Sequence, residues 1–248
     1  MRFTDYDPMA WLYATRWGGE YHEQAFSILD GMLFSRLPRG ARILDLCCGD
    51  GRIAQQLWLN GFDVIGIDGS ERMLDFARER SPAVPFIAAD ARDFRLDRKV
   101  DAVISTFDAL NHIMNTDELD DVFSCVYRSL NASGTFVFDL NREDAYTTLW
   151  STTYTIVEPD VVCCCTGAYD PKIRTAHADF TVFRPIGAAW ERSDFRMRQY
   201  CHDEQVILAK LRAVGFAEVT RLDAAIDLGM WGNIGQGRNY FIASGVNG

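Results

Sequence analysis

Residues 43–52, Ile-Leu-Asp-Leu-Cys-Cys-Gly-Asp-Gly-Arg, begin as an apolar strand and run into a turn with two glycines. The apolar spacing after the turn predicts a helix over residues 52–59. A turn between a strand and a helix directs unpaired backbone N–H groups and the positive end of the helix dipole toward one point. Because Gly49 and Gly51 carry no Cβ atom, a ligand can approach the backbone closely there. The stretch therefore predicts a loop that binds a nucleotide-type cofactor.

Two cofactors are compatible with this loop. The Gly-x-Gly-x-x-Ala spacing over residues 49–54 matches the dinucleotide fingerprint, so an NAD-type Rossmann oxidoreductase is one interpretation. The sequence LDLCCGDG also resembles the first motif of class I S-adenosylmethionine (SAM)-dependent methyltransferases. The residues that lie on that family pattern are Asp45, Cys48, Gly49 and Gly51. Cys47 stands where the family has Gly or Ala, and its side chain is small enough for a close turn.

A carboxylate follows the next expected strand. Residues 63–67 predict a strand, and Asp68 at its end lies 17 residues beyond Gly51. An acid at this point can accept hydrogen bonds from both hydroxyls of a ribose. Ser70 is suited to cap a helix that begins after it. Because Asp68 and the glycine loop both follow strands, at the spacing expected for a cofactor site, we favour a ribose-binding role for Asp68.

A third segment distinguishes the two interpretations. Residues 85–88 predict a short strand, and the following Ala-Asp-Ala-Arg-Asp-Phe, residues 89–94, resembles the adenine-binding segment of the SAM enzymes. In that family an acid at the place of Asp90 accepts a hydrogen bond from the adenine amino group. Residues 67–74 also resemble the family. Three motifs in family order favour the methyltransferase over the dehydrogenase.

The resemblance implies a site for SAM and for its product S-adenosylhomocysteine (SAH). The residues expected to line the cofactor site are Tyr13, Asp45, Cys47, Gly49, Gly51, Arg52, Asp68, Gly69, Met73, Asp90, Ala91, Arg92, Thr106 and Phe107. In this family the strand expected over residues 101–105 ends beside the reactive methyl group. His112 follows that strand and titrates near neutrality, so it is the candidate catalytic base. A structural histidine at the start of a helix is an equally open interpretation.

The fold expected is α/β, with a Rossmann-like, seven-stranded methyltransferase sheet whose last strand is antiparallel. Residues 5–37 predict helices, and a long helix is expected over 203–214. Residues 131–134 predict a turn before a strand over 135–139, and strands over 217–222 and 238–243 complete the sheet. Alternating polar and apolar residues predict an inserted antiparallel sheet over residues 145–200. This arrangement resembles small-molecule methyltransferases with a β insert, such as amino-sugar N,N-dimethyltransferases.

The predicted domain division follows from this pattern. Residues 1–144 and 201–248 are expected to form the SAM-binding domain, and residues 145–200 to form an insert that contributes to the substrate pocket. Aromatic faces can bind a cationic sulfonium and close over a pocket. The N-terminal residues 1–25 are therefore expected to form a helical lid. The aromatic residues expected to act in this lid are Tyr6, Trp11, Tyr13 and Trp17.

Composition narrows the class of partner. The chain has 248 residues and a net charge of −10, which argues against nucleic acid as substrate because phosphates need basic surface. The first residues do not suggest a secretion signal, and no apolar run is long enough to span a membrane. The seven cysteines include adjacent pairs that fit neither a disulfide framework nor zinc-site spacing. A reducing cytoplasm is therefore the expected location.

The sequence favours transfer of a methyl group to a small-molecule acceptor, and an amine in particular. No acidic cluster with Mg²⁺ spacing is found, so no metal is expected. Four arginines of the insert could instead attract an anionic acceptor; they are Arg184, Arg192, Arg196 and Arg198. The expected assembly is a monomer or a homodimer. A non-catalytic SAM-binding protein remains a second alternative beside the NAD-type oxidoreductase.

Overall fold

The computed structural model describes residues 6–17 and 19–246 and contains two β-sheets. The larger sheet has seven strands in the order β10-β11-β5-β4-β1-β2-β3. Its strands are β1 (Arg42–Leu46), β2 (Asp63–Asp68), β3 (Phe86–Ala88), β4 (Val100–Ser105), β5 (Leu130–Asn141), β10 (Phe216–Asp223) and β11 (Arg238–Val246). Neighbouring strands from β3 to β5 are parallel, whereas β11 is antiparallel to both β5 and β10. The predicted seven-stranded sheet with an antiparallel last strand is confirmed.

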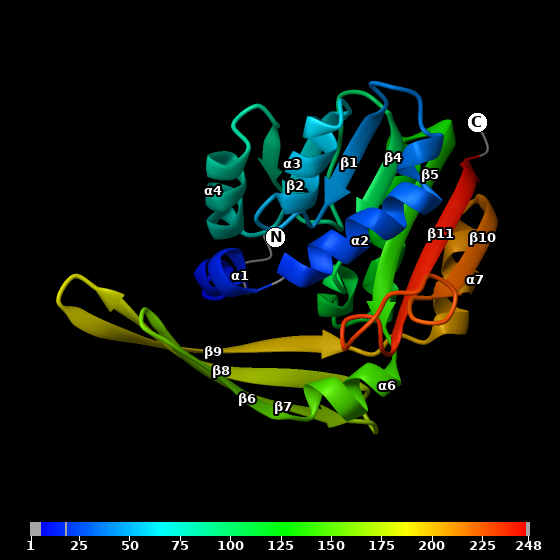
Figure 1. Cartoon of the computed structure of the whole chain (residues 1–248). Coiled ribbons are helices and arrows are strands. Elements are labelled where there is room, and N and C mark those ends of the chain that lie inside the picture. Colours follow the sequence, from blue (N-terminus) through cyan, green and yellow to red (C-terminus); the bar gives the residue numbers. More distant parts are fainter. Residues whose placement is uncertain (1–5, 18, 247–248) are drawn as a thin grey trace.

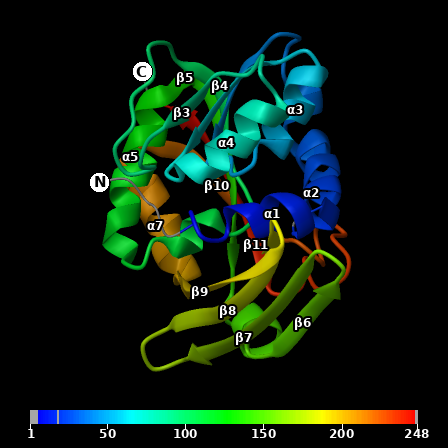
Figure 2. The ribbon, with the colours of Figure 1, turned by 90° about the vertical axis from the view of Figure 1, so that its left-hand side faces the viewer.

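Helices cover both faces of this sheet (Figures 1 and 2). On one face lie α2 (Gly19–Met32) and α3 (Arg52–Leu59), and on the other lie α5 (Leu119–Ser129) and α7 (Glu204–Val214). α4 (Glu71–Arg80) packs beside β2 and β3 at the end of the sheet. Each helix turns an apolar stripe toward the strands, so the sheet is buried on both sides.

The second sheet is the insert, with strands in the order β6-β7-β8-β9. They are β6 (Thr153–Glu158), β7 (Val161–Asp170), β8 (Thr175–Ile186) and β9 (Ala189–Tyr200), all antiparallel. In Figure 1 this sheet lies below the larger one, at the end toward which the parallel strands point. Cys163 and Cys165 are buried and Cys164 is exposed, as the period of two predicts.

The first helix, α1 (Ala10–Arg16), lies between the two sheets, beside α4 (Figure 2). Its buried face joins one apolar cluster with Met73 of α4 and with Phe180 and Met197 of the insert. Because this short helix has few residues of its own to bury, contacts from both sides hold it in place. The insert and the cofactor-side helices therefore meet through α1.

Short helical elements complete the chain between the longer ones. They are the 3₁₀ helices η1 (Phe34–Arg36), η2 (Ala109–His112) and η3 (Thr116–Glu118), the single turn α6 (Glu143–Ala145) and the π-helix η4 (Tyr146–Trp150). Gly167 of β7 lets η4 approach the insert, since a Cβ atom there would lie 1.7 Å from the backbone oxygen of Trp150.

Several sequence-based boundaries differ from the structure by a few residues, and two of the differences have a clear physical cause. Residues 131–134 were expected to form a turn before a strand over 135–139, but β5 already begins at Leu130. Leu130 pairs with Val100 of β4, and an irregularity in the register follows, so backbone pairing extends through the turn-like residues. The last long helix begins one residue later than expected, because Asp203 caps it by accepting hydrogen bonds from two backbone N–H groups.

The packing of the glycine loop yields a stability prediction. Gly51 has φ 75°, and a Cβ atom there would lie 2.9 Å from the Cβ of Ala77 and 3.0 Å from the ring of Phe86. Gly61 has φ 87° with nothing within 4 Å, so it is a matched control. Gly61→Ala should lower the free energy of unfolding by about 1–2 kcal/mol, the usual cost of a left-handed side-chain-bearing residue.

Gly51→Ala should lower the free energy of unfolding by about 1–3 kcal/mol more than Gly61→Ala does, because an extra carbon in a filled site displaces its neighbours. Urea unfolding of both variants measures the difference. Equal losses would contradict the tight contact between the loop and α4.

Candidate functional site

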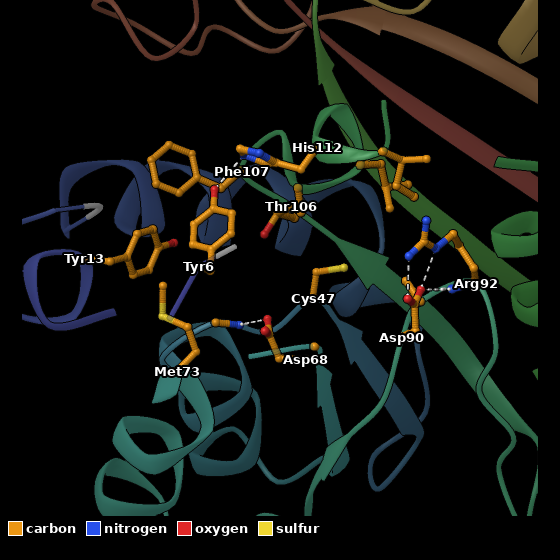
Figure 3. A pocket seen from close by; sticks show the side chains of 16 residues that line it. Tyr6, Tyr13, Cys47, Asp68, Met73, Asp90, Arg92, Thr106, Phe107 and His112 are labelled. Carbon is orange, nitrogen blue, oxygen red and sulfur yellow. Dashed lines mark hydrogen bonds and ion pairs between the residues drawn. The ribbon is translucent and has the colours of Figure 1, made fainter. Parts of the chain in front are cut away.

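A cavity of about 720 Å³ lies where the parallel strands end (Figure 3). Its walls come from the segments that follow β1, β2, β3 and β4 and from the N-terminal residues. Ligands of open α/β sheets bind at this edge, because all the strand-to-helix turns open there. The residues that line the cavity are Tyr6, Tyr13, Cys47, Gly49, Asp68, Gly69, Met73, Asp90, Ala91, Arg92, Thr106, Phe107, Ala109, Leu110, His112 and Ile113.

The loop after β1 forms one side of the cavity. Gly49 has φ 54° and Cys47 has φ 60°, so the backbone turns twice through the left-handed region. A cysteine rarely adopts the left-handed conformation. This gives a physical reason why a small residue is usual at the position of Cys47. A Cβ atom on Gly49 would lie 3.5 Å from the ring of Tyr13, so this ring of α1 lies directly against the loop.

Asp68 at the end of β2 holds this loop in place. One carboxylate oxygen accepts a hydrogen bond from the N–H of Gly49 at 2.9 Å, and the other accepts from the N–H of Ser70 at 2.8 Å. Burial raises the pKa of Asp68 to about 6, although these two hydrogen bonds act to lower it. Each oxygen keeps a second lone pair, so the carboxylate can still accept hydroxyl donors of a ligand.

In Figure 3, Asp90 and Arg92 lie at the end of the cavity opposite to Tyr13 and Met73. Both oxygens of Asp90 accept from the Arg92 guanidinium, at 2.8 and 2.6 Å, and the Arg92 N–H donates to one of them at 2.9 Å. Burial acts to raise the pKa of Asp90, but these hydrogen bonds and the charge of Arg92 bring it below its usual value. The pair is further fixed by an ion pair from Arg92 to Glu118.

Three of the expected cofactor residues lie behind the cavity wall rather than in it. Asp45 is buried within β1, and desolvation followed by the charge of Asp68 raises its pKa to about 8. Gly51 begins α3 and packs against α4. Arg52 donates to the backbone oxygen of Ala14 at 2.7 Å and so joins the loop to α1. These residues support the wall, and the other eleven expected cofactor residues line it.

A second cavity of about 1080 Å³ adjoins the first and extends to the insert. Its walls are rich in aromatic side chains: Tyr6, Tyr13, Trp17, Phe107, Trp150, Tyr154 and Phe180. Two inward-facing residues of β9, Met197 and Gln199, also line it, as do Asp108 and Arg238. A cavity with an aromatic wall and a few convergent polar groups is typical of small-molecule binding.

The two cavities share a wall made by Tyr6, Tyr13, Phe107 and His112. The Tyr6 hydroxyl lies 2.6 Å from Nε2 of His112, and the two rings meet edge to face at 4.8 Å (Figure 3). The Tyr13 hydroxyl lies 3.2 Å from Nε2 of His22. A group held in one cavity can therefore face a group held in the other across the Tyr6–His112 pair.

A buried ion cluster forms the floor of the second cavity. Arg238 of β11 pairs with Asp108 at 2.7 Å and with Asp139 of β5, and its guanidinium lies 4.9 Å above the ring of Tyr21. Two carboxylates and one guanidinium leave this cluster with a formal charge of −1 when all three are ionised. Phe107 and Asp108 both adopt left-handed φ angles, 63° and 50°, which is the strain expected where a strand end serves a site.

The arginines of the insert lie elsewhere. Arg192 pairs with Asp194 at 2.8 Å and Arg196 with Asp179 at 2.6 Å, and both arginines are exposed on the face turned away from the cavity. Arg184 lies over the ring of Trp11. None of these three residues, nor Arg198, lines the second cavity. The structure therefore gives no support to an anionic acceptor held by the insert.

Sequence reasoning missed three residues of the site. Tyr6 was expected only as a lid aromatic, and Gln199 and Arg238 were not singled out. Their partners His112 and Asp108 lie 87 to 130 residues away in sequence. The period of two along β9 was the only signal for Gln199. It places Gln199 on the same face as Met197 and so indicates that its side chain points inward.

Over residues 6–17 and 19–246, no three His, Cys, Asp or Glu side chains are grouped to hold a metal ion. No helix of that part of the chain is long and apolar enough to cross a membrane.

Known proteins resemble this chain in sequence and in structure. Residues 43–134 match the family described as a methyltransferase domain. A dTDP-3-amino-3,4,6-trideoxy-alpha-D-glucopyranose N,N-dimethyltransferase of Streptomyces venezuelae is 34% identical over 122 residues, 49% of this chain and 51% of that enzyme. The chain spans about half the length of the curated relatives it matches.

Solved structures extend the likeness to nearly the whole chain. A SAM-dependent methyltransferase from Clostridium acetobutylicum has a TM-score of 0.78 with 19% identity, covering 96% of this chain and 98% of that one. DesVI of Streptomyces venezuelae has a TM-score of 0.76 with 23% identity, covering 98% and 99%. The glycine loop therefore lies in a segment that matches a methyltransferase domain, which favours the methyltransferase interpretation of the loop over the dehydrogenase one, and nearly the whole chain has the fold of the solved SAM-dependent methyltransferases.

Proposed function

We propose that this chain is a SAM-dependent methyltransferase that methylates an amine of a small molecule. The observation that carries the proposal is the shared wall of the two cavities at Tyr6, Tyr13, Phe107 and His112. A transfer between two bound molecules needs the donor and the acceptor to face each other, and two adjoining cavities with a common wall supply that arrangement.

The residues of the first cavity have the chemistry that SAM requires. The close approach allowed by Gly49 suits a ligand held against the backbone, and Asp68 keeps lone pairs for ribose hydroxyls. Asp90, fixed by Arg92, is the group for the adenine end. Tyr13, Met73, Thr106 and Phe107 would surround the remainder. When bound, the sulfonium supplies an electrophilic methyl group.

The polar groups at the shared wall can manage a proton. An amine attacks only through its unprotonated nitrogen, so an ammonium acceptor must lose a proton first. The Tyr6 hydroxyl can take that proton while it gives its own to Nε2 of His112, since the two atoms are 2.6 Å apart. Alignment of the two reactants can by itself lower the barrier by roughly 7–11 kcal/mol.

The second cavity is suited to a cationic or neutral acceptor. Aromatic faces attract cations, and the net negative charge of the Arg238 cluster acts in the same direction. Relatives named as amino-sugar N,N-dimethyltransferases support an amine as the acceptor group. The negative total charge of −10 makes nucleic acid a poor partner.

The remaining features of the proposal concern the setting of the enzyme. We propose that residues 1–144 and 201–248 hold the cofactor and that residues 145–200 help to hold the acceptor. A reducing cytoplasm is the proposed location, because all seven cysteines are free thiols. A monomer or homodimer is the proposed assembly.

The cofactor role of Asp68 predicts how affinity depends on side chain and pH. Asp68→Ala should weaken SAH binding by about 1.5–3 kcal/mol, the scale of a hydrogen bond to a charged group. The ionised carboxylate is the better acceptor, and its pKa is about 6. Affinity should therefore be full above pH 6 and fall as pH decreases below it, by at most about tenfold per pH unit.

Calorimetry with SAH from pH 5 to pH 8 measures both effects. Asp68→Asn should bind weakly with a flat pH dependence over that range. Asp63→Ala, at the exposed far end of the same strand, is the control and should bind normally. Unchanged affinity in Asp68→Ala would mean that this carboxylate does not hold the ribose.

The position of α1 predicts that a bound cofactor slows amide hydrogen exchange in the N-terminal segment. Tyr6 and Tyr13 line the first cavity, so a ligand there should restrain residues 6–17. We expect amide hydrogen exchange of this segment to slow when SAH is added, while exchange in α5 on the far face of the sheet stays constant. Equal protection with and without SAH would make α1 ordinary packing and not a lid.

The acceptor class and the role of His112 can be tested together. A panel of amines, phenols and carboxylates assayed for SAH release should show turnover with an amine. His112→Ala should lower kcat by about 100-fold and change KM less, because a proton acceptor acts on the reacting nitrogen. In the wild type, activity should rise with pH as the acceptor and His112 lose their protons.

His177→Ala is the control for the loss of an imidazole, since His177 lies on β8 outside both cavities. Preference for a carboxylate or phosphorylated acceptor would contradict the amine proposal. SAH binding without turnover on a broad metabolite extract would indicate the non-catalytic alternative.

A further inference from the structure

Gln199 connects the insert to the candidate base. It lies on β9 with no exposed surface, and its side chain reaches the wall of the second cavity. Its amide nitrogen lies 2.5 Å from Oδ2 of Asp108 and 2.9 Å from Nε2 of His112. Its amide oxygen accepts from the Tyr146 hydroxyl at 2.9 Å and from the Asn141 amide at 3.3 Å. All four hydrogen-bonding positions of this amide are therefore in use.

These partners determine which way the amide points. An ionised carboxylate only accepts hydrogen bonds, so the side of Gln199 that meets Asp108 at 2.5 Å must be the NH₂ group. The Tyr146 hydroxyl and the Asn141 amide nitrogen supply donors to the opposite side. A reversed amide would place its oxygen against the carboxylate and lose these bonds. The second N–H of the NH₂ group is then directed at His112.

The orientation of Gln199 in turn determines the tautomer of His112. Nε2 faces an N–H donor at 2.9 Å, so in the neutral ring it is the acceptor nitrogen and the proton lies on Nδ1. The Tyr6 hydroxyl approaches the same Nε2 atom at 2.6 Å from the side of the two cavities. The nitrogen that could take a proton from Tyr6 is therefore kept unprotonated.

We propose that Gln199 is a positioning residue for the methyl-transfer reaction: it holds the His112 imidazole with Nε2 unprotonated and turned toward Tyr6. The inference rests on the proposed function, and it assigns to the insert a role in catalysis beside that of enclosing the acceptor. Because Gln199 acts through His112, its removal should reduce the rate of transfer more than the binding of the acceptor.

The charges around His112 set the direction of the expected pH effect. Tyr6 contacts His112 directly, Asp108 and Tyr146 reach it through Gln199, and Asp139 and Arg238 follow through Asp108. His202 lies against the backbone of Leu110 and Ile113, on either side of His112 in sequence. Burial raises the pKa of both tyrosines and lowers that of His202 to about 4, so all three are neutral near pH 7. Asp108, Asp139 and Arg238 remain as the buried cluster with a formal charge of −1, which favours a positive charge on His112. The N–H of Gln199 opposes protonation of Nε2, so its loss favours the imidazolium ion.

The test replaces Gln199 with a side chain of similar size that cannot donate. Gln199→Leu should lower kcat by about tenfold with little change in KM. It should also move the acid limb of the kcat/KM profile upward by about one pH unit. Tyr146→Phe removes one of the two donors that orient the amide and keeps the ring, so it should give a smaller change in the same direction. Arg198→Gln, the exposed neighbour on β9, should behave as the wild type.

A spectroscopic measurement separates this inference from the proposed activity. With ¹⁵N-labelled histidine, Nε2 of His112 should show the shift of an unprotonated nitrogen at pH 8, assigned by loss of the signal in His112→Asn. Gln199→Leu should add the second tautomer and raise the titration midpoint. This readout needs no turnover, so it stands even if no acceptor is found.

If Gln199→Leu does not fold, the pH profile of kcat/KM and the ¹⁵N shifts of His112 are measured in Tyr146→Phe, and these two results test the proposal. A protonated Nε2 in the neutral wild-type ring would overturn the proposal. The proposal would also be overturned if the folded variants had the same His112 shifts, the same titration midpoint and the same pH profile as the wild type.

Discussion

The pairing of one buried guanidinium with two buried carboxylates organises the floor of the site. Arg238 of β11 connects Asp139 of β5 to Asp108, which follows β4, so three neighbouring strands of the sheet meet at one cation. Burying charges is costly, and removing one partner of such a cluster leaves an unpaired charge at a cost of about 3–5 kcal/mol. The cluster therefore fixes the end of β4, including the left-handed residues Phe107 and Asp108.

The same cluster explains how the two cavities come to differ. Phe107 lies under both of them, stacked on Tyr21 at 4.1 Å, and Asp108 accepts from Gln199 on the second side only. Toward the first cavity the sheet presents strand ends with backbone N–H groups and the acids Asp68 and Asp90. Toward the second it presents aromatic rings and a network centred on one ion pair. The first is suited to a polar nucleoside and the second to an amine with an apolar body.

The parts of the site that lie close together in sequence could be predicted from it. The glycine loop, Asp68 and Asp90 each follow a strand at a short and regular spacing, so local patterns locate them. The alternation over residues 145–200 correctly predicted antiparallel strands, and the same period of two explains why Cys163 is buried and Cys164 exposed. It did not reveal which face of the insert meets the sheet, because both faces carry aromatic side chains.

The parts that depend on distant contacts could not be predicted. Tyr6 and His112 are 106 residues apart, and Asp108 and Arg238 are 130 residues apart. No periodicity of sequence relates residues at such separations; only the closure of the sheet and the return of β9 bring them together. The turn expected at residues 131–134 failed for the same reason, since the pairing of Leu130 with Val100 outweighs the local preference.

A crystal structure with SAH and an amine acceptor tests the central claim most directly. We expect the adenine beside Asp90, the sulfur near Phe107, and the amine nitrogen in the second cavity within reach of the Tyr6–His112 pair. An SAH molecule placed in the reverse direction, or an amine bound away from the wall that the two cavities share, would contradict it.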